Sequence, residues 1–360
     1  MNAARAHPSY PVNQLARISA RQINARSSVS EFMGRGPSME TQTIVEASSA
    51  TRGRRVALPG RIRRFRRPGR LLMPYLFVLP FVLLFIAFFV APFVYAFWQS
   101  LYTVKHSGLG FGPPQTVWAG FDNYLKAIRD PNFWDGLKRV LLFGAVQIPV
   151  MMIVALVLAL LMDSAIVRFR RFFRLAFFVP YAVPGVVAAI MWGFFYSPGS
   201  SPIIQAFTAF HLPAPNLLGD SSTLWSIANI STWTYTGYNM IIFYSALQGI
   251  PQEIYESGRL DGLSELGIAL RLKLPLILPA IIFGLLFSIV GTLQLFNEPL
   301  VLKNLSSAIT SSYTPNIFAY NVAVVNTDFN YGGAIAVILG VVTFIFSFGF
   351  LRLTRRQSGV

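Results

Sequence analysis

Six long apolar segments separated by polar connections dominate the pattern along this chain. Each segment reaches the roughly 20 residues that an α-helix needs to cross a hydrocarbon core of about 30 Å. The pattern therefore predicts an all-α, polytopic membrane domain over residues 71–356, with six transmembrane helices. The segments cover residues 74–100, 140–162, 175–196, 223–247, 276–297 and 332–351.

A polar interruption at residues 248–274, between the fourth and fifth apolar segments, has a pattern of its own. Isoleucine, tyrosine and leucine recur there at roughly helical spacing beside acidic residues, which predicts a short amphipathic helix. Asp261 and Gly262 then indicate a turn before a second helix, and Pro275 and Pro279 mark the entry to the fifth segment. A helix-turn-helix folded between membrane spans is typical of an element that a partner protein binds.

The composition agrees with a membrane protein. Hydrophobic residues make up 54% of the chain and charged residues only 12%, whereas a soluble globular protein carries about 25% charged residues. A net charge of +16 would suggest nucleic-acid binding in a soluble protein, but the apolar composition argues against it. The chain has no cysteine, which excludes disulfides, cysteine metal sites and thiol catalysis.

Residues 1–70 are rich in Ser, Ala and Arg and show no sustained hydrophobic period. A segment of this kind cannot bury enough apolar surface to offset its ordering entropy, so we predict a disordered, basic cytosolic tail. The arginines between Arg61 and Arg70 directly precede the first apolar segment. We interpret them as an anchor to anionic lipid and expect no nucleic-acid partner. Met33 and Met39 are alternative starts of the chain.

The basic residues predict an orientation. If the N-terminus is cytoplasmic, the segments on the cytoplasmic side hold twenty-four of the thirty Lys and Arg residues, and the outer segments hold six. Cytoplasmic loops of membrane proteins carry an excess of Lys and Arg. The distribution therefore places both termini and the 248–274 loop in the cytoplasm.

The six segments contain no Asp, Glu, Lys, Arg or His. Such residues inside a membrane usually mark ion paths or proton relays, so their absence argues against an ion-coupled carrier. No lysine follows a glycine, which excludes a Gly-x-x-x-x-Gly-Lys phosphate loop. The three histidines show no metal-ligand spacing, and Glu253 and Glu256 share a helix face beside no evident pocket. We therefore expect no enzyme activity, no metal and no cofactor in this chain.

Hydrogen-bonding side chains interleave with aromatic rings in the fourth and fifth segments. Ser231, Tyr235 and Tyr238 are spaced to share one helix face, while Trp233, Asn239 and Tyr244 lie elsewhere on that helix. In the fifth segment Gln294 and Asn297 are three residues apart, with Glu298 next at the outer end. This chemistry suits a neutral polyhydroxylated ligand. Polar contacts between helices and an interfacial aromatic belt remain alternative roles for these residues.

The polar loop also carries a specific motif. It reads Glu256-Ser257-Gly258-Arg259-Leu260-Asp261-Gly262-Leu263, followed by Leu272-Lys273-Leu274-Pro275. This resembles the EAA signature, Glu-Ala-Ala-x-x-Asp-Gly-Ala with an Ile/Leu-x-Leu-Pro tail, of binding-protein-dependent ABC importer permeases. The chain is most similar to the carbohydrate-uptake branch, in particular to the larger maltose and glycerol-phosphate permeases. Further family-like stretches are 120–124, 173–174 with Pro180, 246–251 and 295–298.

The resemblance implies that the loop forms a coupling helix that docks on a nucleotide-binding ATPase subunit. Glu256 would face a basic group of that subunit, and Gly262 would permit the tight turn. Ser257 and Gly258 replace the two alanines of the signature, and glycine costs a helix about 1 kcal/mol relative to alanine. We therefore expect the first helix to end or bend at Gly258. The implied coupling residues are Glu253, Glu256, Ser257, Gly258, Asp261 and Gly262.

The same resemblance implies the partners: a second permease subunit, two ATPase subunits that bind ATP and magnesium, and an extracytoplasmic substrate-binding protein. The expected function is import of a mono- or oligosaccharide by alternating access. Glycerol phosphate or another small solute is an alternative cargo, and a membrane scaffold or receptor without transport is an alternative function. The resemblance also implies the plasma (inner) membrane of a bacterium as the location. From the side-chain pattern given above, we expect the substrate contacts to be Ser231, Tyr235, Tyr238, Gln294 and Asn297.

Overall fold

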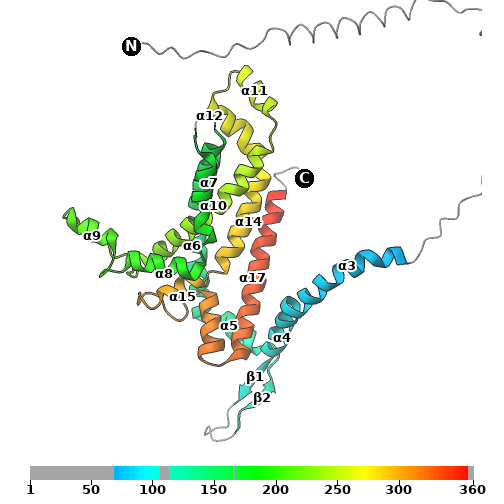
Figure 1. The fold of residues 1–360 in the computed structure, drawn as a ribbon. Helices are drawn as coiled ribbons and strands as arrows, with labels where there is room; N and C mark the ends of the chain where they lie inside the picture. The colour runs from blue at the N-terminus through cyan, green and yellow to red at the C-terminus, as the bar shows by residue number, and fades with distance from the viewer. Residues whose placement is uncertain (1–68, 106–112, 165–166, 356–360) are drawn as a thin grey trace, which may run out of the picture. The chain divides into compact units, whose positions relative to one another are not determined.

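The computed structural model describes residues 69–105, 113–164 and 167–355. The predicted disordered tail at residues 1–70 therefore lies almost wholly outside the described residues. Within them the chain is helical apart from one short hairpin (Figure 1), as predicted.

The first apolar segment is one continuous helical rod. It consists of α3 (Gly69–Phe85), a five-residue π-helical turn η3 (Ile86–Val90) and α4 (Ala91–Ser100). Pro92 lacks the N–H that would continue regular helical bonding, and widened turns of this type accompany such interruptions. An 18-residue window within Tyr75–Ser100 has a mean hydropathy of 2.8 and contains no buried residue, whereas Ser100 at the end of α4 is buried.

A small structured element that the sequence pattern did not predict follows this rod. Strands β1 (Tyr102–Lys105) and β2 (Gln115–Trp118) pair antiparallel, with Tyr102 opposite Trp118, and α5 (Asp122–Arg129) comes next. The buried Asn123 side chain ties α5 to the end of α4, because its Nδ2 donates to the carbonyl oxygens of Ser100 at 2.8 Å and Tyr102 at 2.7 Å.

Two long helices form the centre of the bundle. Helix α6 (Pro131–Asp163) begins nine residues before the predicted start at residue 140, since Asp130 caps it by accepting from the N–H of Asn132 at 2.9 Å. It packs along α10 (Thr223–Gln248), and Ala155, Met240 and Phe243 are fully buried between the helices.

The third predicted segment, residues 175–196, is not one straight helix. It divides into α7 (Arg170–Ala182) and α8 (Gly185–Tyr196), which meet at 95°. Val183 is extended, with φ −76° and ψ 126°, because the residue before a proline is disfavoured in the helical region and Pro184 follows. A short helix, α9 (Pro202–Ala209), comes after α8.

Beyond α10 the chain forms the predicted helix-turn-helix and returns to the bundle. Helices α11 (Gln252–Leu260) and α12 (Glu265–Ile268) are followed by the π-helical turn η4 (Ala269–Lys273) and by α13 (Leu274–Leu276). The remaining elements are α14 (Leu278–Leu293), α15 (Asn297–Leu302), α16 (Pro315–Tyr320), the π-helical turn η5 (Asn321–Val325) and α17 (Phe329–Arg355).

Four segments of the described chain are long and apolar enough to cross a membrane, and the bent pair α7–α8 is a fifth candidate. Helix α10 has 26 residues but is not among them, since Ser, Thr, Asn and Tyr side chains lower its hydropathy. The predicted count of six spans thus stays a prediction. The four segments are Tyr75–Ser100, Pro131–Asp163, Leu278–Leu302 and Phe329–Thr354.

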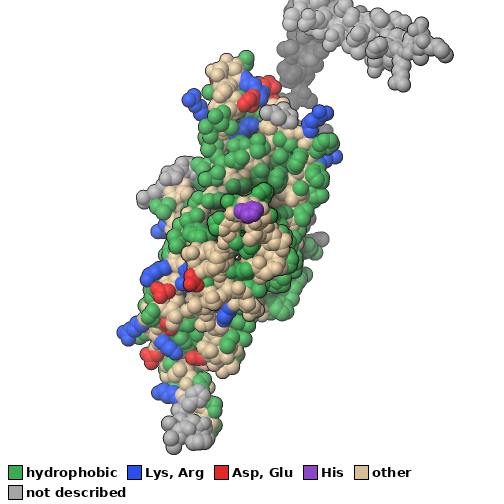
Figure 2. Space-filling view, turned by 90° about the vertical axis from the view of Figure 1, so that its left-hand side faces the viewer, with side chains coloured by type: hydrophobic (Ala, Val, Ile, Leu, Met, Phe, Trp, Pro, Cys, Tyr) green, Lys and Arg blue, Asp and Glu red, His purple; other side chains and the backbone are tan. Residues whose placement is uncertain are grey.

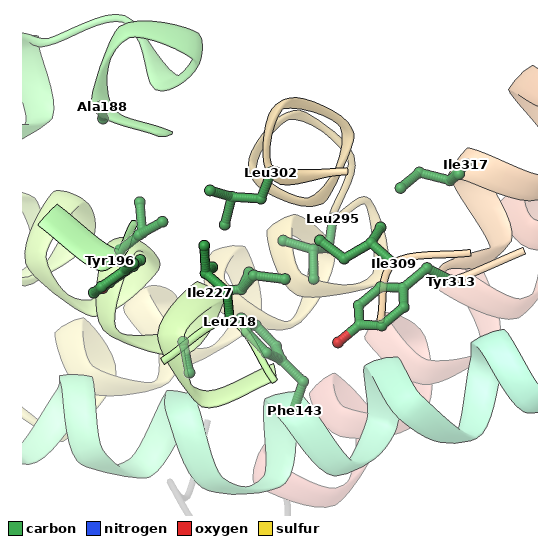
Figure 3. Packing of buried hydrophobic residues seen from close by; sticks show 12 residues of the cluster. Phe143, Ala188, Tyr196, Leu218, Ile227, Leu295, Leu302, Ile309, Tyr313 and Ile317 are labelled. Carbon is green, nitrogen blue, oxygen red and sulfur yellow. The ribbon is translucent and has the colours of Figure 1, made fainter. Parts of the chain in front are cut away.

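Apolar contacts fix α8, α10, α15 and the α15–α16 loop to one another. Tyr196, Ile227, Leu302 and Tyr313 belong to one buried cluster (Figure 3). On the face shown in Figure 2, charged side chains gather toward the two ends, and the stretch between them is mostly apolar. That distribution suits a protein whose middle lies in hydrocarbon.

Candidate functional site

A polar cavity of about 270 Å³ lies among α6, α7, α10, α14 and α15. The five residues predicted to contact substrate come from two separate segments of the chain, and all of them line the cavity. They are Ser231, Tyr235, Tyr238, Gln294 and Asn297. The structure thus brings the predicted set together in one place.

Three tyrosine rings form one wall of this cavity. The ring of Tyr181, from α7, stacks on that of Tyr238 with centroids 4.7 Å apart and an interplanar angle of 21°. Tyr235 meets Tyr181 edge-on at 6.1 Å. Tyr181 and Tyr235 are 39% and 42% exposed, so both rings present accessible apolar faces together with hydroxyl groups. Amphipathic rings of this kind are suited to ligands that are apolar on one face and polar at the edge.

The opposite wall depends on a break in the chain. Helix α14 ends at Leu293, and the backbone leaves helical geometry before α15 begins at Asn297; Phe296 has φ −144° and ψ −54°. The interruption lets Gln294 and Asn297 both line the cavity. Irregular backbone at membrane depth is tolerated where it lines a cavity or is buried in protein.

The sequence interpretation missed part of the lining. Asn239 was placed away from the polar face of its helix, yet it lines the cavity beside Gln147 and Tyr181. Its Nδ2 donates to the carbonyl oxygen of Tyr235 at 3.1 Å, and its buried Oδ1 has no hydrogen-bond partner. The sequence did contain a signal for such lining residues, namely a polar side chain inside a long apolar run, as at Gln147.

Glu298 corrects the expectation that the spans carry no charge. The predicted fifth segment stopped at residue 297, but the apolar stretch runs through Leu278–Leu302 and contains Glu298. Its side chain lines the cavity and is only 6% exposed. It is the one ionisable acid or base among the described lining residues other than the tyrosines.

The second candidate site is the tip formed by α11 and α12. Glu253 and Glu256 are exposed on α11, as is Ser257, whose Oγ donates to the carbonyl oxygen of Ile254 at 3.0 Å. Asp261 ends the helix, and Gly262 makes the turn with φ +81°. That left-handed conformation favours glycine, in agreement with the predicted role of Gly262 in the turn.

Gly258 does not end or bend the helix, contrary to expectation. Helix α11 continues through it to Leu260, and Gly258 is the buried residue of this helix. A Cβ at this position would lie 2.7 Å from Leu272 Cδ1. Glycine therefore lets the Leu272 side chain of η4 pack closely on α11, and this packing accompanies its low helix propensity.

Two features of the tip were not predicted. Leu260 and Leu266 are 89% and 69% exposed, so the turn presents apolar side chains outward beside the exposed acids. Arg259 Nε lies 2.9 Å from Glu265 Oε1 across the turn. The hydrogen bond between them raises the pKa of Arg259 and lowers the pKa of Glu265. A surface with exposed leucines and carboxylates is suited to docking a protein with a basic-rimmed groove.

The tip is joined to the bundle through a buried polar junction. Lys273 Nζ lies 2.5 Å from Asp163 Oδ2, and Gln248 Nε2 donates to Asp163 Oδ1 at 2.7 Å. The Lys273 ammonium also lies 4.7 Å from the centre of the Tyr255 ring. Burial, and then the charge of Asp163, raises the pKa of Tyr255 to about 12. The ends of α6, α10, α11 and η4 therefore meet in one network.

Comparison with known proteins identifies the family. Residues 152–357, more than half of the chain, match the family described as "Binding-protein-dependent transport system inner membrane component". The lactose transport system permease protein LacF of Rhizobium radiobacter is 29% identical over 69% of this chain and 83% of its own length. The arabinooligosaccharides transport system permease protein AraP of Bacillus subtilis is 27% identical over 79% and 90%. The sn-glycerol-3-phosphate transport system permease protein UgpA of Salmonella typhimurium is 30% identical over 61% and 72%.

Solved structures agree on the fold. A chain of a bacterial alginate ABC transporter, solved in complex with an alginate pentasaccharide-bound periplasmic protein, superposes with a TM-score of 0.70 at 18% identity. The match covers 82% of this chain and 98% of that one. A second structure of an alginate importer gives a TM-score of 0.69 over 80% and 96%. The chain described here belongs to the family of binding-protein-dependent transport system inner membrane components.

Proposed function

We propose that this chain is the permease subunit of an ATP-driven importer whose cargo is a neutral mono- or oligosaccharide. The observation that carries the proposal is the cavity, which combines stacked tyrosine rings, amides and hydroxyls and has no Lys, Arg or His among its described lining residues. The names of LacF and AraP, which specify lactose and arabinooligosaccharides, point to the same cargo class.

Glycerol phosphate is the second candidate cargo, because UgpA carries that name. A phosphate dianion requires cationic or N–H donors at close range. The described lining offers Gln147, Asn239, Gln294 and Asn297 as amide donors but no cation. The cavity therefore favours a sugar over a phosphate ester.

Transport would proceed by alternating access. The chain pairs with a second permease subunit, two ATPase subunits bind ATP and magnesium, and a substrate-binding protein delivers the cargo from outside. The tip of α11 and α12 docks on an ATPase through Glu253, Glu256, Leu260 and Leu266, and the Lys273–Asp163 junction passes its movement to α6. ATP shifts the populations because it binds one state better than the other.

The membrane topology is part of the proposal. Helix α10 is the sixth span, enclosed by α6, α7 and α14, so that its polar side chains face the cavity and other helices rather than lipid. Both termini and the tip lie in the cytoplasm. The rod α3–η3–α4 has no buried residue in its apolar window, which suits contact with lipid or with the second permease. The chain itself has no enzymatic role.

Radiolabelled sugar uptake tests the proposal. A strain lacking this chain is compared with the same strain complemented by the wild-type chain, across neutral sugars that include lactose and arabinooligosaccharides, with sn-glycerol 3-phosphate in parallel. We expect uptake of at least one neutral sugar to be lost and restored. Unchanged uptake of every sugar would favour a scaffold or receptor, and a selective defect in glycerol phosphate would favour the second cargo.

A further inference from the structure

A buried carboxylate without a cationic partner among the described residues lies in the cavity. The side chain of Glu298 is 6% exposed, yet it forms no ion pair with any described Lys, Arg or His. Burying an ionised carboxylate costs several kcal/mol unless it is paired or hydrogen-bonded. No described Lys, Arg or His balances the acid group of Glu298, so its presence in the cavity requires another explanation.

The surroundings of Glu298 leave room beside its carboxylate. A Cβ on Gly185 would lie 3.7 Å from Asn297 Nδ2 and 4.0 Å from Glu298 Oε1. Glycine at this position, directly after the 95° bend, therefore leaves space beside both polar groups. Asn239 adds no acceptor here, because its Oδ1 is buried and would lie 2.9 Å from a Cβ on Gly284. A carboxylate with no cation beside it indicates a ligand that donates hydrogen bonds.

We propose that Glu298 determines the charge of the cargo, by accepting hydrogen bonds from hydroxyl or ammonium groups and by repelling anions. The proposal rests on the proposed function and narrows it: neutral sugars and amino sugars enter the cavity, while uronates and sugar phosphates are excluded. Its physical basis is that an uncompensated charge in a partly desolvated cavity acts over several ångströms with a strength well above its value in water.

Three isosteric probes test the charge preference directly. Galactose, galacturonate and galactosamine share the same sugar ring, and they are neutral, anionic and cationic, respectively. Their binding to the intact complex in phosphatidylcholine nanodiscs, without nucleotide or binding protein, is measured by saturation-transfer NMR. The variants are Glu298→Gln, which keeps the shape and removes the charge, and Asp135→Asn. Asp135 is an exposed carboxylate at the start of α6, and its substitution removes the same charge outside the cavity lining.

The wild-type complex should bind galacturonate at least about tenfold more weakly than galactose, and galactosamine no more weakly than galactose. In Glu298→Gln the difference in affinity between galactose and galacturonate should shrink to about twofold. This variant should keep the galactose affinity and the thermal midpoint of the wild-type complex. Asp135→Asn should keep the wild-type order of affinities for the three probes.

Equal binding of galactose and galacturonate by the wild-type complex would overturn the proposal. A charge preference that survives Glu298→Gln would do the same, because another group, such as a cation of the second permease, would then set the selectivity. If no probe binds, Glu298 has no role in sugar selection. Sugar import would still be decided independently by the cellular uptake experiment.

Discussion

Lys273 Nζ lies 2.5 Å from Asp163 Oδ2, and the pair links two segments 110 residues apart in the chain. Asp163 ends α6, and Lys273 ends the π-helical turn that leads from the tip back into the bundle. The two side chains are only 7% and 12% exposed, so solvent screens their attraction weakly. Any displacement of the tip must therefore move the end of α6 or break the pair.

Asp163→Asn should destabilise the protein and weaken coupling. The substitution leaves the Lys273 ammonium largely buried without a counter-charge, and loss of one partner of a buried pair costs roughly 3 kcal/mol. We expect a lower thermal midpoint of the purified complex and fewer sugar molecules imported per ATP hydrolysed. Fluorescence-detected thermal unfolding and paired uptake and phosphate-release assays measure the two effects.

The double variant Asp163→Asn/Lys273→Gln is the matched control. It removes both charges, so no uncompensated ammonium remains, and it should recover most of the lost stability. If coupling stays weak while stability returns, the ion pair itself transmits movement. A double variant as unstable as Asp163→Asn would contradict the pairing energy assigned here.

Glu256→Ala should leave assembly intact and uncouple ATP hydrolysis from uptake. Glu256 is exposed on α11, and the described structure gives it no side-chain partner that would hold the fold together. Its loss removes one proposed contact with a basic group of the ATPase. Co-purification of the ATPase subunits and the uptake-to-hydrolysis ratio provide the measurement. If this variant couples ATP hydrolysis to uptake as well as the wild type does, Glu256 is not part of the docking surface.

Gly237→Ala should disrupt the packing of α10 on α7. A Cβ at Gly237 would lie 1.7 Å from the carbonyl oxygen of Phe177, a backbone atom that cannot move without moving its helix. We expect a loss of about 3 kcal/mol in the free energy of unfolding, read as low membrane expression and a lower thermal midpoint. Gly349→Ala is the control, because nothing lies within 4 Å of that Cβ position. It should be neutral or stabilising by up to about 1 kcal/mol.

Stability should fall at alkaline pH in a manner that depends on Tyr255. Burial, and then the Asp163 charge, raises its pKa from 10.0 to about 12, so the folded protein holds this proton more tightly than the unfolded chain. The contribution is complete below pH 10 and is lost as the pH rises toward about 12. Thermal midpoints between pH 9 and 11 should decline more steeply for the wild-type complex than for Tyr255→Phe. Parallel curves would contradict the assigned shift.

The helices, the helix-turn-helix and the cavity-lining set followed from periodicity and spacing. Ser231, Tyr235 and Tyr238 share a helix face by spacing alone, and α10 then packs so that this face meets Gln294 and Asn297. The turn at Gly262 could also be predicted from the sequence, because an Asp-Gly pair after an amphipathic helix favours a left-handed glycine. Local rules determine these features.

Other features depend on contacts between distant segments, which no local pattern contains. The prolines of the third segment indicated an irregularity near Val183 and Pro184, but the sequence did not show whether the helix would kink or break. The structure has a break, and the packing of α8 on α15 accompanies it. Gly258 was expected to interrupt its helix, but the helix continues through it, and the absence of a side chain there leaves room for Leu272. Glu298 was placed just beyond the end of a span, and the packing of α15 on α8 accompanies its burial.

The most direct test of the account is sugar accumulation in proteoliposomes that contain the purified complex of this chain, its second permease and its ATPase subunits. Labelled neutral sugar is added outside with the binding protein, and ATP is enclosed inside with the ATPase side. The account predicts accumulation above the external concentration that requires both ATP and the binding protein. Equilibration without ATP, or ATP hydrolysis with no sugar entry for any neutral sugar that the binding protein holds, would contradict it.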